Sequence, residues 1–179
     1  DRAFDVGICE ENAMVLCSSL ATGGVKPYYA IYSTFLQRAF DEIIHDVCAQ
    51  DMPVTFCIDR AGIVGNDGAT HHGLLDLAYL RPIPNMVIGA PMTSEDMQEM
   101  MTLAKDYDGP IAIRYPRGRT NEPPYPFTTH VEIGKAAGNK AVNHLANARN
   151  IHATGVIGIG QRQPHQTETQ FFRFTHKNS

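Results

Sequence analysis

The chain has 179 residues, of which 43% are hydrophobic, and a formal net charge of −4 at pH 7, which suits one domain of ordinary size with a buried core. Residues 1–136 carry a net charge of −8 and residues 137–179 a net charge of +4, so the first part lacks the basic surface that nucleic-acid binding requires. No apolar run approaches the ~20 residues of a membrane span and no signal peptide is recognisable, so we expect a soluble intracellular piece of a longer protein.

Five short apolar runs, bounded by Pro, Gly, Asp or Asn, predict strands. They are FDVGI (4–8), PYYAIYS (27–33), PVTFCID (53–59), NMVIGAP (85–91) and PIAIRYP (110–116). Runs that are apolar along most of their length are typical of strands with both faces buried in a parallel sheet. VEIGK (131–135) is a candidate for one more strand at the edge of the sheet.

Helical patterns alternate with these runs. A helix is predicted over residues 11–21, where Gly23 and Gly24 provide a stop signal. Apolar residues at spacings of three and four predict helices over residues 35–49 and 94–106, and Thr93 or Ser94 is placed to cap the second. The apolar positions are Leu36, Phe40, Ile43 and Val47 in the first and Met97, Met100, Met101 and Ala104 in the second. This alternation predicts an α/β fold: a mostly parallel sheet of about five or six strands with helices on both faces.

Composition divides the chain into three parts. Residues 1–120 hold the strand and helix patterns and form the predicted domain. Residues 121–136 begin with a Pro-rich stretch and are interpreted as a linker that includes the candidate edge strand. Residues 137–179 are rich in Asn, Gln and His and show no periodicity. Two explanations stay open for this atypical tail: it is a frameshifted or misjoined translation or a divergent end that packs poorly or is disordered, or it is an ordinary surface tail.

Charged and aromatic side chains gather where the predicted strands end. Glu10 opens a helix, Tyr32 and Phe35 follow the second apolar run, and Arg60 and Arg117 follow the third and the fifth. Open α/β sheets place their chemistry at this edge, and two guanidinium groups there suit a phosphate. Each residue also has a structural interpretation. A first-turn Glu complements the helix dipole, aromatic rings fill cores, and arginines form surface ion pairs.

The connection from residue 60 to residue 73 contains four Gly, two His and an Asp without periodicity, and loops of this length in compact domains are usually functional. Asp67, His71 and His72 could be metal ligands, but no further ligand accompanies them at a suitable spacing, so we predict no metal site. The four cysteines form no CxxC pair and are interpreted as reduced and mostly buried.

Four segments carry a family resemblance: FDVGICEENA (4–13), YSTFLQRAFD (32–41), IDRAGIVGNDGATH (58–71) and RYPRG (114–118). Together they closely resemble the pyrimidine-binding domain of the 1-deoxy-D-xylulose-5-phosphate synthases, which are thiamine-diphosphate enzymes of the transketolase group. The resemblance runs from about residue 1 to about residue 136. The chain departs from the family at Glu11 and Asn12, where the family normally has Gln-His, so the contacts of that His are not carried over.

The resemblance implies roles for eight residues. Glu10 would be catalytic because it would form a hydrogen bond to ring nitrogen N1′ of the aminopyrimidine and share a proton with it. His71 would be catalytic because it would assist proton transfer. The implied cofactor-binding residues are Glu10, Phe35, Arg38 and Asp67. The implied substrate-binding residues are Tyr32, Arg60, His71 and Arg117. The two arginines of the second set would hold the phosphate of glyceraldehyde 3-phosphate. Arg114 and Arg119 are weaker candidates.

The implied cofactor is thiamine diphosphate, whose pyrimidine half would bind here and which would itself supply the difficult chemistry. Its Mg²⁺ would be held by a diphosphate-binding domain through Gly-Asp-Gly and a later Asn. The nearest match in this sequence is Asn66-Asp67-Gly68, so we expect this chain to supply no metal ligand. The implied partners are pyruvate, glyceraldehyde 3-phosphate, the diphosphate-binding domain and, in the complete enzyme, a second copy in a homodimer.

The complete enzyme would condense pyruvate with glyceraldehyde 3-phosphate with loss of carbon dioxide, in a bacterial cytoplasm or in a plastid. Its product would serve isoprenoid, thiamine and pyridoxal synthesis, and the chain alone would be inactive. Two other interpretations stay open: a transketolase or 2-oxo-acid dehydrogenase β-subunit-like domain, and a non-catalytic fragment that binds a partner domain. The DRAG and RYPRG sequences favour the synthase over the first alternative.

Overall fold

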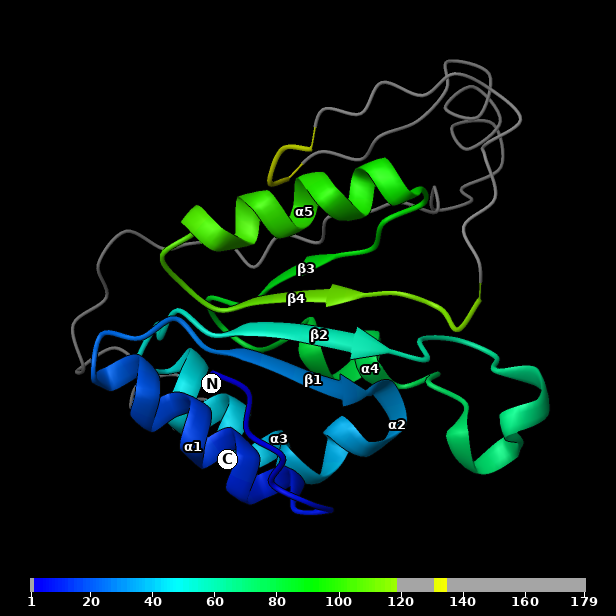
Figure 1. Cartoon of the computed structure of the whole chain (residues 1–179), viewed down its shortest axis with the longest axis horizontal. Helices are drawn as coiled ribbons and strands as arrows, with labels where there is room; N and C mark the ends of the chain where they lie inside the picture. The colour runs from blue at the N-terminus through cyan, green and yellow to red at the C-terminus, as the bar shows by residue number, and fades with distance from the viewer. Residues whose placement is uncertain (1, 119–130, 135–179) are drawn as a thin grey trace, which may run out of the picture.

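A computed structural model describes residues 2–118 and 131–134 of the chain (Figure 1). Within these residues, four parallel strands form one sheet in the order β1-β2-β4-β3. The strands are β1 (Tyr28–Tyr32), β2 (Thr55–Asp59), β3 (Val87–Gly89) and β4 (Ile111–Arg114). The predicted α/β class and parallel sheet are therefore confirmed. The strand order makes β1, β2 and β4 neighbours, and these are the strands that precede the predicted site residues.

Helices cover both faces of the sheet, as predicted (Figure 1). The longest are α1 (Glu10–Thr22) and α5 (Ser94–Asp106). The shorter elements are α2 (Ser33–Leu36), η1 (Gln37–Ala39), α3 (Phe40–Glu42), η2 (Ile43–Cys48), η3 (Gly65–Asp67), η4 (Ala69–His71) and α4 (Asp76–Leu80). Thr93 caps α5 in a reciprocal capping box with Asp96, and Gly23 follows the end of α1, so both predicted helix-boundary signals are confirmed.

Two apolar clusters hold these layers together. Ala112 packs in the larger cluster, on the side of α1 and the helical segment 33–48. Its neighbours Ile111 and Ile113 pack on the opposite side with α5, where Met100 and Ala104 face the sheet. Successive strand residues point to opposite faces, so burial of all three shows that this central strand is covered on both sides. That explains why the three residues of PIAIRYP before Arg114 in this strand are all apolar instead of alternating with polar residues.

Several sequence-based expectations differ from the structure. The FDVGI run forms no strand: the Asp5 carboxylate accepts a hydrogen bond from the Gly7 amide, Gly7 has φ +70°, and Phe4 and Ile8 are largely exposed. This local turn interrupts an extended conformation. The described part of VEIGK, residues 131–134, contains a turn and no strand. Four described strands thus replace the five or six expected.

The helix expected over residues 35–49 is instead a continuous but irregular segment of α, 3₁₀ and π turns over residues 33–48. Leu36, Ile43 and Val47 are fully buried as the spacing predicted, whereas Phe40 is 37% exposed because the change of helix type rotates it away. The short helix α4 was not predicted. The predicted linker at 121–136 lies mostly outside the described residues, and the predicted tail at 137–179 lies entirely outside them.

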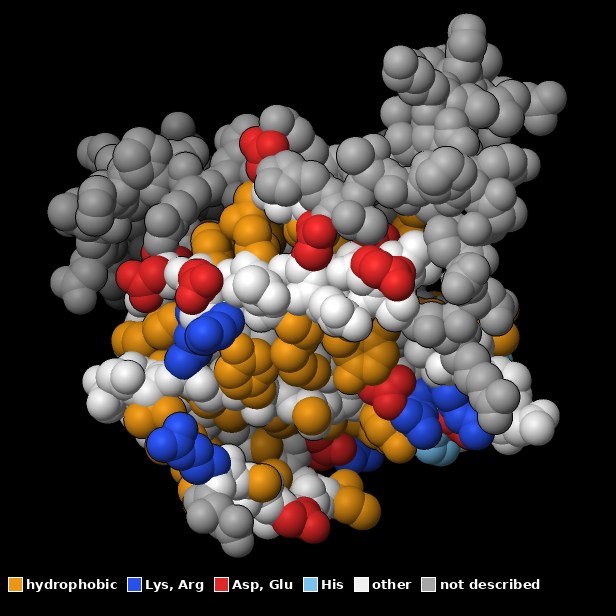
Figure 2. All heavy atoms as spheres, turned by 45° about the horizontal axis from the view of Figure 1, so that its top comes forward, with side chains coloured by type: hydrophobic (Ala, Val, Ile, Leu, Met, Phe, Trp, Pro, Cys, Tyr) orange, Lys and Arg blue, Asp and Glu red, His pale blue; other side chains and the backbone are white. Residues whose placement is uncertain are grey.

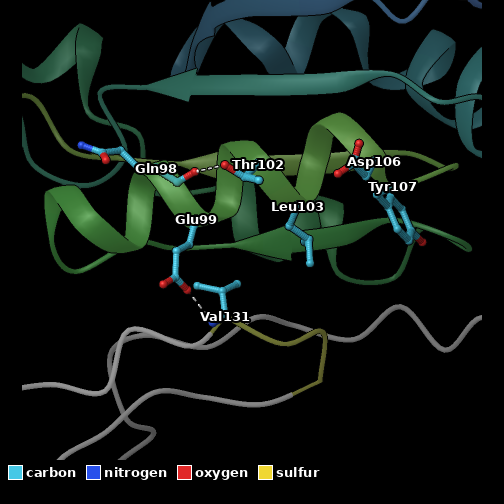
Figure 3. A pocket seen from close by; sticks show the side chains of 7 residues that line it. All are labelled: Gln98, Glu99, Thr102, Leu103, Asp106, Tyr107 and Val131. Atoms are coloured by element: carbon cyan, nitrogen blue, oxygen red, sulfur yellow. Dashed lines mark hydrogen bonds between the residues drawn. The ribbon is translucent and has the colours of Figure 1, made fainter.

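A pocket lies on the outer face of α5, lined by Gln98, Glu99, Thr102, Leu103, Asp106, Tyr107 and Val131 (Figure 3). The Glu99 carboxylate accepts a hydrogen bond from the Val131 amide at 2.9 Å, which ties residues 131–134 to the helix. None of the predicted site residues lines this pocket. Among the described helices, none has the length and apolar character that a membrane crossing needs.

Candidate functional site

The predicted site residues meet at the carboxyl end of the sheet. Tyr32 ends β1 and is in register with Asp59, the last residue of β2, while Arg114 ends β4 beside Ile58. In Figure 1 this is the end where the strand arrows point toward α2 and the long connection at 60–73. Figure 2 shows acidic, basic and histidine side chains grouped at one side of the molecule. Parallel strands gather their chemistry at such an edge because all their carboxyl ends lie together.

Glu10 and Arg38 form the first part of the site. Glu10 is the first residue of α1 and is 7% exposed. Each of its two carboxylate oxygens accepts a hydrogen bond from Nη1 of Arg38 at 3.3 Å. These bonds are longer than the about 2.7–2.9 Å of strong charge-assisted bonds, and a carboxylate has about four acceptor positions, so capacity for another donor remains. The backbone carbonyl of Glu10 accepts from the hydroxyl of Tyr29 at 3.1 Å.

Tyr29 stays a donor because its phenol is held neutral. Burial raises the pKa of Tyr29 well above its usual value, and the negative charge of Glu10 raises it further. The hydroxyl therefore anchors the first turn of α1 to β1 over the whole neutral pH range. This contact fixes the backbone from which the Glu10 carboxylate projects.

An aromatic group lies beside the carboxylate. The rings of Tyr32 and Phe35 stack at 5.9 Å between centroids with an interplanar angle of 21°. The imidazole of His71 meets Phe35 edge-on at 5.3 Å and lies 6.4 Å from the ring of Tyr32. The guanidinium of Arg38 lies 5.8 Å from the centre of the Phe35 ring. Phe35 is thus the residue that links the Glu10 side of the site to His71.

Two arginines converge on one carboxylate in the second part of the site. Nε of Arg60 lies 3.2 Å and Nε of Arg117 3.3 Å from the same oxygen, Oδ2 of Asp67. Arg60 also pairs with Asp59, and its guanidinium lies over the ring of Tyr32 at 3.9 Å from the centroid. Burial would lower the pKa of Arg60, but the charges of Asp59 and its other partners outweigh this and raise it.

Arg60 also has an unusual backbone. Its φ is +57°, the left-handed region that non-glycine residues seldom occupy. The backbone amide donates to Oδ1 of Asp59 at 2.6 Å, and this contact with the preceding side chain supports the turn. The turn directs the chain out of β2 into the connection at 60–73. Strained conformations of this kind persist where the surroundings determine them, often at functional sites.

The connection itself is an ordered loop closed at its base. The amide of Gly62 donates to the carbonyl of Gly73, and the amide of Gly73 to the carbonyl of Gly62, both at 2.8 Å. Within the loop, His72 accepts from the amide of Val64 through Nδ1 at 3.2 Å. His72 therefore has a structural role that its position in the sequence did not indicate. The 3₁₀ turns η3 and η4 then present Asp67 and His71 to the site.

All eight predicted site residues belong to one connected set. Contacts run from Glu10 through Arg38, Phe35, Tyr32 and Arg60 to Asp67 and Arg117, with His71 against the two aromatic rings. The Glu10 end offers a buried carboxylate beside an aromatic face, which suits a flat ring with a basic ring nitrogen. The other end offers two guanidinium groups, which suit a phosphate.

Sequence reasoning missed two acidic residues of this edge. Asp59 partners Arg60 but reads in the sequence as the end of an apolar run. Asp76, in the unpredicted helix α4, is 1% exposed and binds Arg114, which was considered a weaker candidate. Arg119 lies outside the described residues. All four cysteine thiols are free; Cys17 and Cys48 are buried, Cys57 is partly buried and Cys9 is exposed. Among the described residues, no three His, Cys, Asp or Glu side chains are grouped to hold a metal.

Comparison with known proteins identifies the family to which the chain belongs. The family described as "Transketolase, pyrimidine binding domain" matches residues 1–123. The 1-deoxy-D-xylulose-5-phosphate synthase of Pelotomaculum thermopropionicum is 64% identical over 116 residues, which are 65% of this chain and 18% of that protein. The synthase of Gloeobacter violaceus is 58% identical over 139 residues, 76% of this chain and 22% of that protein. The chain therefore spans about a fifth of the length of these curated relatives.

Solved structures show the same fold. An inactive β4 tetramer of a split gene transketolase has a TM-score of 0.62 at 29% identity, covering 74% of this chain and 43% of that chain. The transketolase of Campylobacter jejuni has a TM-score of 0.61 at 22% identity, covering 69% of this chain and 20% of that chain. At that identity, the second likeness is one of fold alone.

Proposed function

We propose that the chain, which belongs to the family of transketolase pyrimidine-binding domains, forms the pyrimidine-binding half of the cofactor site in a 1-deoxy-D-xylulose-5-phosphate synthase. The complete enzyme would transfer two carbons of pyruvate to glyceraldehyde 3-phosphate with loss of carbon dioxide. The observation that carries this proposal is the connected set of side chains from Glu10 to Arg117 at one sheet edge.

The Glu10 end fits the aminopyrimidine of thiamine diphosphate. The carboxylate is buried but keeps free acceptor capacity, so it could hold a proton at the ring nitrogen. The partly exposed ring of Phe35 offers a flat apolar surface for stacking. Arg38, with 54% of its side chain exposed, can move aside without a large burial cost. When bound, the cofactor supplies the nucleophile and the electron sink that decarboxylation of pyruvate needs.

The Arg60 and Arg117 end fits the phosphate of the acceptor. Both guanidinium groups already bind an anionic oxygen, that of Asp67, from two directions. A phosphate offers more acceptor oxygens of the same kind, and arginine binds them with charge-assisted hydrogen bonds. Tyr32 and His71 line the space between the two ends, where they would orient the reacting parts of the substrates.

The comparisons favour the synthase over the other transketolase-like enzymes. Identity to curated synthases reaches 64%, whereas identity to the transketolase structures is 29% or lower. Because the chain spans a fifth of those synthases, we assign the cofactor's diphosphate, its Mg²⁺ and the dimer contacts to parts of the enzyme beyond this domain. The product would feed isoprenoid, thiamine and pyridoxal synthesis, and the bacterial relatives favour a bacterial cytoplasmic enzyme.

A domain exchange tests the proposal. The 116 residues that match the Pelotomaculum thermopropionicum synthase replace the corresponding residues of that enzyme, and product formation from pyruvate and glyceraldehyde 3-phosphate is measured. We expect this hybrid enzyme to retain synthase activity and to lose it when Glu10 is replaced. A folded hybrid with no synthase activity would overturn the proposal. The same exchange with the Campylobacter jejuni transketolase domain, which shares the fold alone, is the matched control.

A further inference from the structure

We propose that Asp76 and Arg114 are a pair of positioning residues that hold the 60–73 loop and Arg117 in the geometry required for phosphate binding. This inference rests on the proposed function, but it concerns two residues that touch neither the predicted cofactor site nor the predicted phosphate site. Asp76 was assigned no role from the sequence, and Arg114 was considered only as a weaker candidate for the phosphate site. The pair deepens the proposed function by explaining how two arginines from distant segments come to share one anion.

The pair is buried and bidentate. Nε of Arg114 donates to Oδ2 of Asp76 at 2.8 Å, and Nη2 donates to Oδ1 at 3.3 Å. Oδ1 also accepts from the backbone amide of Leu77 at 2.9 Å. Asp76 is 1% exposed and the side chain of Arg114 is 19% exposed. Both oxygens of the buried carboxylate are therefore satisfied, and its position is fixed relative to β4 in two directions.

The Asp76–Arg114 pair is one of two attachments between the 60–73 loop and the end of β4. Asp76 follows Gly73, which ends the loop, by three residues, and Arg114 ends the central strand β4. On the other side, the amide of Ala61 donates to the carbonyl of Tyr115 at 3.0 Å, directly after Arg60. The amide of Tyr115 in turn donates to the carbonyl of Ile58 at 2.9 Å. The 60–73 loop is thus attached to the end of β4 both where it begins and just after it ends.

These two attachments determine where the phosphate-binding groups lie. Arg117 follows Arg114 by three residues across Pro116, while Arg60 and Asp67 lie on the 60–73 loop. The two arginines meet at one oxygen only while the loop and the β4 end keep their relative position. Loss of the Asp76 contact would remove the attachment of the loop's end to β4 and leave the contact of Ala61 with Tyr115 and the pairing of Gly62 with Gly73 in place. A displacement of about 1 Å at such a site can change a rate by about a hundredfold.

Kinetics in the hybrid synthase test this role. We expect Asp76→Asn and Arg114→Lys to raise the KM for glyceraldehyde 3-phosphate by about tenfold to a hundredfold, while the rate of pyruvate decarboxylation changes little. Lys26→Met is the stability control, because Lys26 donates to the carbonyls of Lys105 and Tyr107 at the opposite end of the sheet. It should lower the melting temperature without raising that KM.

A double variant separates positioning from stability. Replacing one partner leaves a buried polar group without its pair, whereas replacing both by apolar residues of similar size often restores stability. Asp76→Leu with Arg114→Met should therefore recover most of the melting temperature lost in the single variants but keep the raised KM. If the double variant regains a normal KM together with stability, the pair only stabilises the fold and the positioning role is wrong.

Hydrogen exchange in the 179-residue chain itself provides a readout that does not need an active enzyme. Asp76→Asn should speed exchange of the Gly62, Val64 and Gly73 amides about tenfold or more, and should leave the amides of α1 and α5 unchanged. Equal acceleration throughout the chain would also overturn the positioning role. An inactive unmutated hybrid would instead overturn the proposed function, and the exchange pattern would still show whether the pair holds the loop.

Discussion

Glu10 combines two properties that seldom occur together, a buried carboxylate and unused acceptor capacity. Its one side-chain partner among the described residues is Arg38, whose Nη1 lies 3.3 Å from both oxygens. A helix N-terminus alone would favour a charged carboxylate that points into solvent. Here the side chain is 8% exposed, and it lies on the same side as the partly exposed Phe35 ring that Arg38 also contacts. This placement is what a proton-holding residue next to a heteroaromatic ring requires.

Replacing Glu10 by Gln tests that interpretation. The amide keeps the shape and can still hydrogen-bond the ring nitrogen of thiamine diphosphate, but it cannot hold or share the proton there. In the hybrid synthase we expect cofactor affinity and melting temperature to change little. Exchange of the cofactor's C2 proton, followed by NMR after acid quench, should slow by about 10²–10⁴-fold, as is typical for a lost acid–base group. Unchanged exchange would reduce Glu10 to a helix-capping charge.

The two arginines differ in how much they do besides bind an anion. Arg117 has 46% of its side chain exposed and, within the part of the chain that the structure describes, pairs with Asp67 alone, whereas Arg60 also pairs with Asp59 and covers Tyr32. Arg117→Ala should therefore raise the KM for glyceraldehyde 3-phosphate by about one to two powers of ten and leave pyruvate decarboxylation nearly intact. Arg60→Ala should raise the same KM and also lower the decarboxylation rate, because Tyr32 loses its neighbour.

Steady-state kinetics with each substrate varied in turn measure the two effects. Arg81→Ala is the control, since Arg81 is an exposed arginine that takes part in none of the contacts described above that join the predicted site residues. Equal losses in both half-reactions for Arg117→Ala would mean that this arginine supports the scaffold rather than the phosphate.

At the scale of elements, the 60–73 loop depends on close contact between its base and α2. An added Cβ at Gly73 would overlap the carbonyl oxygen of Arg60 and the side chain of Ser33, both of which are fixed. Gly73→Ala should therefore lower stability by about 1–3 kcal/mol, the usual cost of overpacking, and displace Asp67 and His71. Gly118→Ala, where no atom of the described residues lies within 4 Å of the added Cβ, should lower it far less. Chemical denaturation of both variants checks this, and equal stabilities would contradict the tight packing.

The sequence predicted the elements whose signals are local. The N-cap at Thr93 and the mostly apolar runs of β2 and β4 depend on near neighbours, and these were predicted correctly, although the sequence did not single out Asp96 as the second half of the capping box. FDVGI failed because apolar content alone cannot reveal a turn at Gly7, and α4 was missed because five residues carry too little periodicity. The irregular segment 33–48 kept the predicted apolar spacing for most of its length, which is why only Phe40 was misplaced.

The candidate site was predictable in membership but not in geometry. Most of its residues follow strand ends, so their meeting at one edge follows from a parallel sheet; Glu10, which follows a turn and opens α1, is the exception. The sequence does not show which segments contact each other. It therefore could not predict that two arginines share one oxygen of Asp67, or that Asp59, Asp76 and His72 make the contacts at the loop described above. The roles of the eight residues stay predictions until the variants are measured.

At the scale of the whole molecule, apolar side chains remain uncovered around the site. Ile63, Leu74 and Leu75 are exposed by 75%, 61% and 60%, and Phe4 and Ile8 by 70% and 87%. Figure 2 shows a broad group of hydrophobic side chains on the face of the molecule that it presents. Large exposed apolar areas mark surfaces that contact other proteins or domains. The proposed diphosphate-binding domain would cover part of this surface when it completes the cofactor site.

The chain by itself should therefore form no 1-deoxy-D-xylulose 5-phosphate, because positioning of both halves of the cofactor accounts for much of such catalysis. Its exposed apolar residues should also make it associate with itself as concentration rises. Product assays and sedimentation velocity from low to high micromolar concentration test both parts.

Adding the separately expressed diphosphate-binding part of the Pelotomaculum thermopropionicum synthase should reduce self-association and restore product formation. Activity of the chain alone, or a monomer at every concentration, would mean that this domain needs no partner.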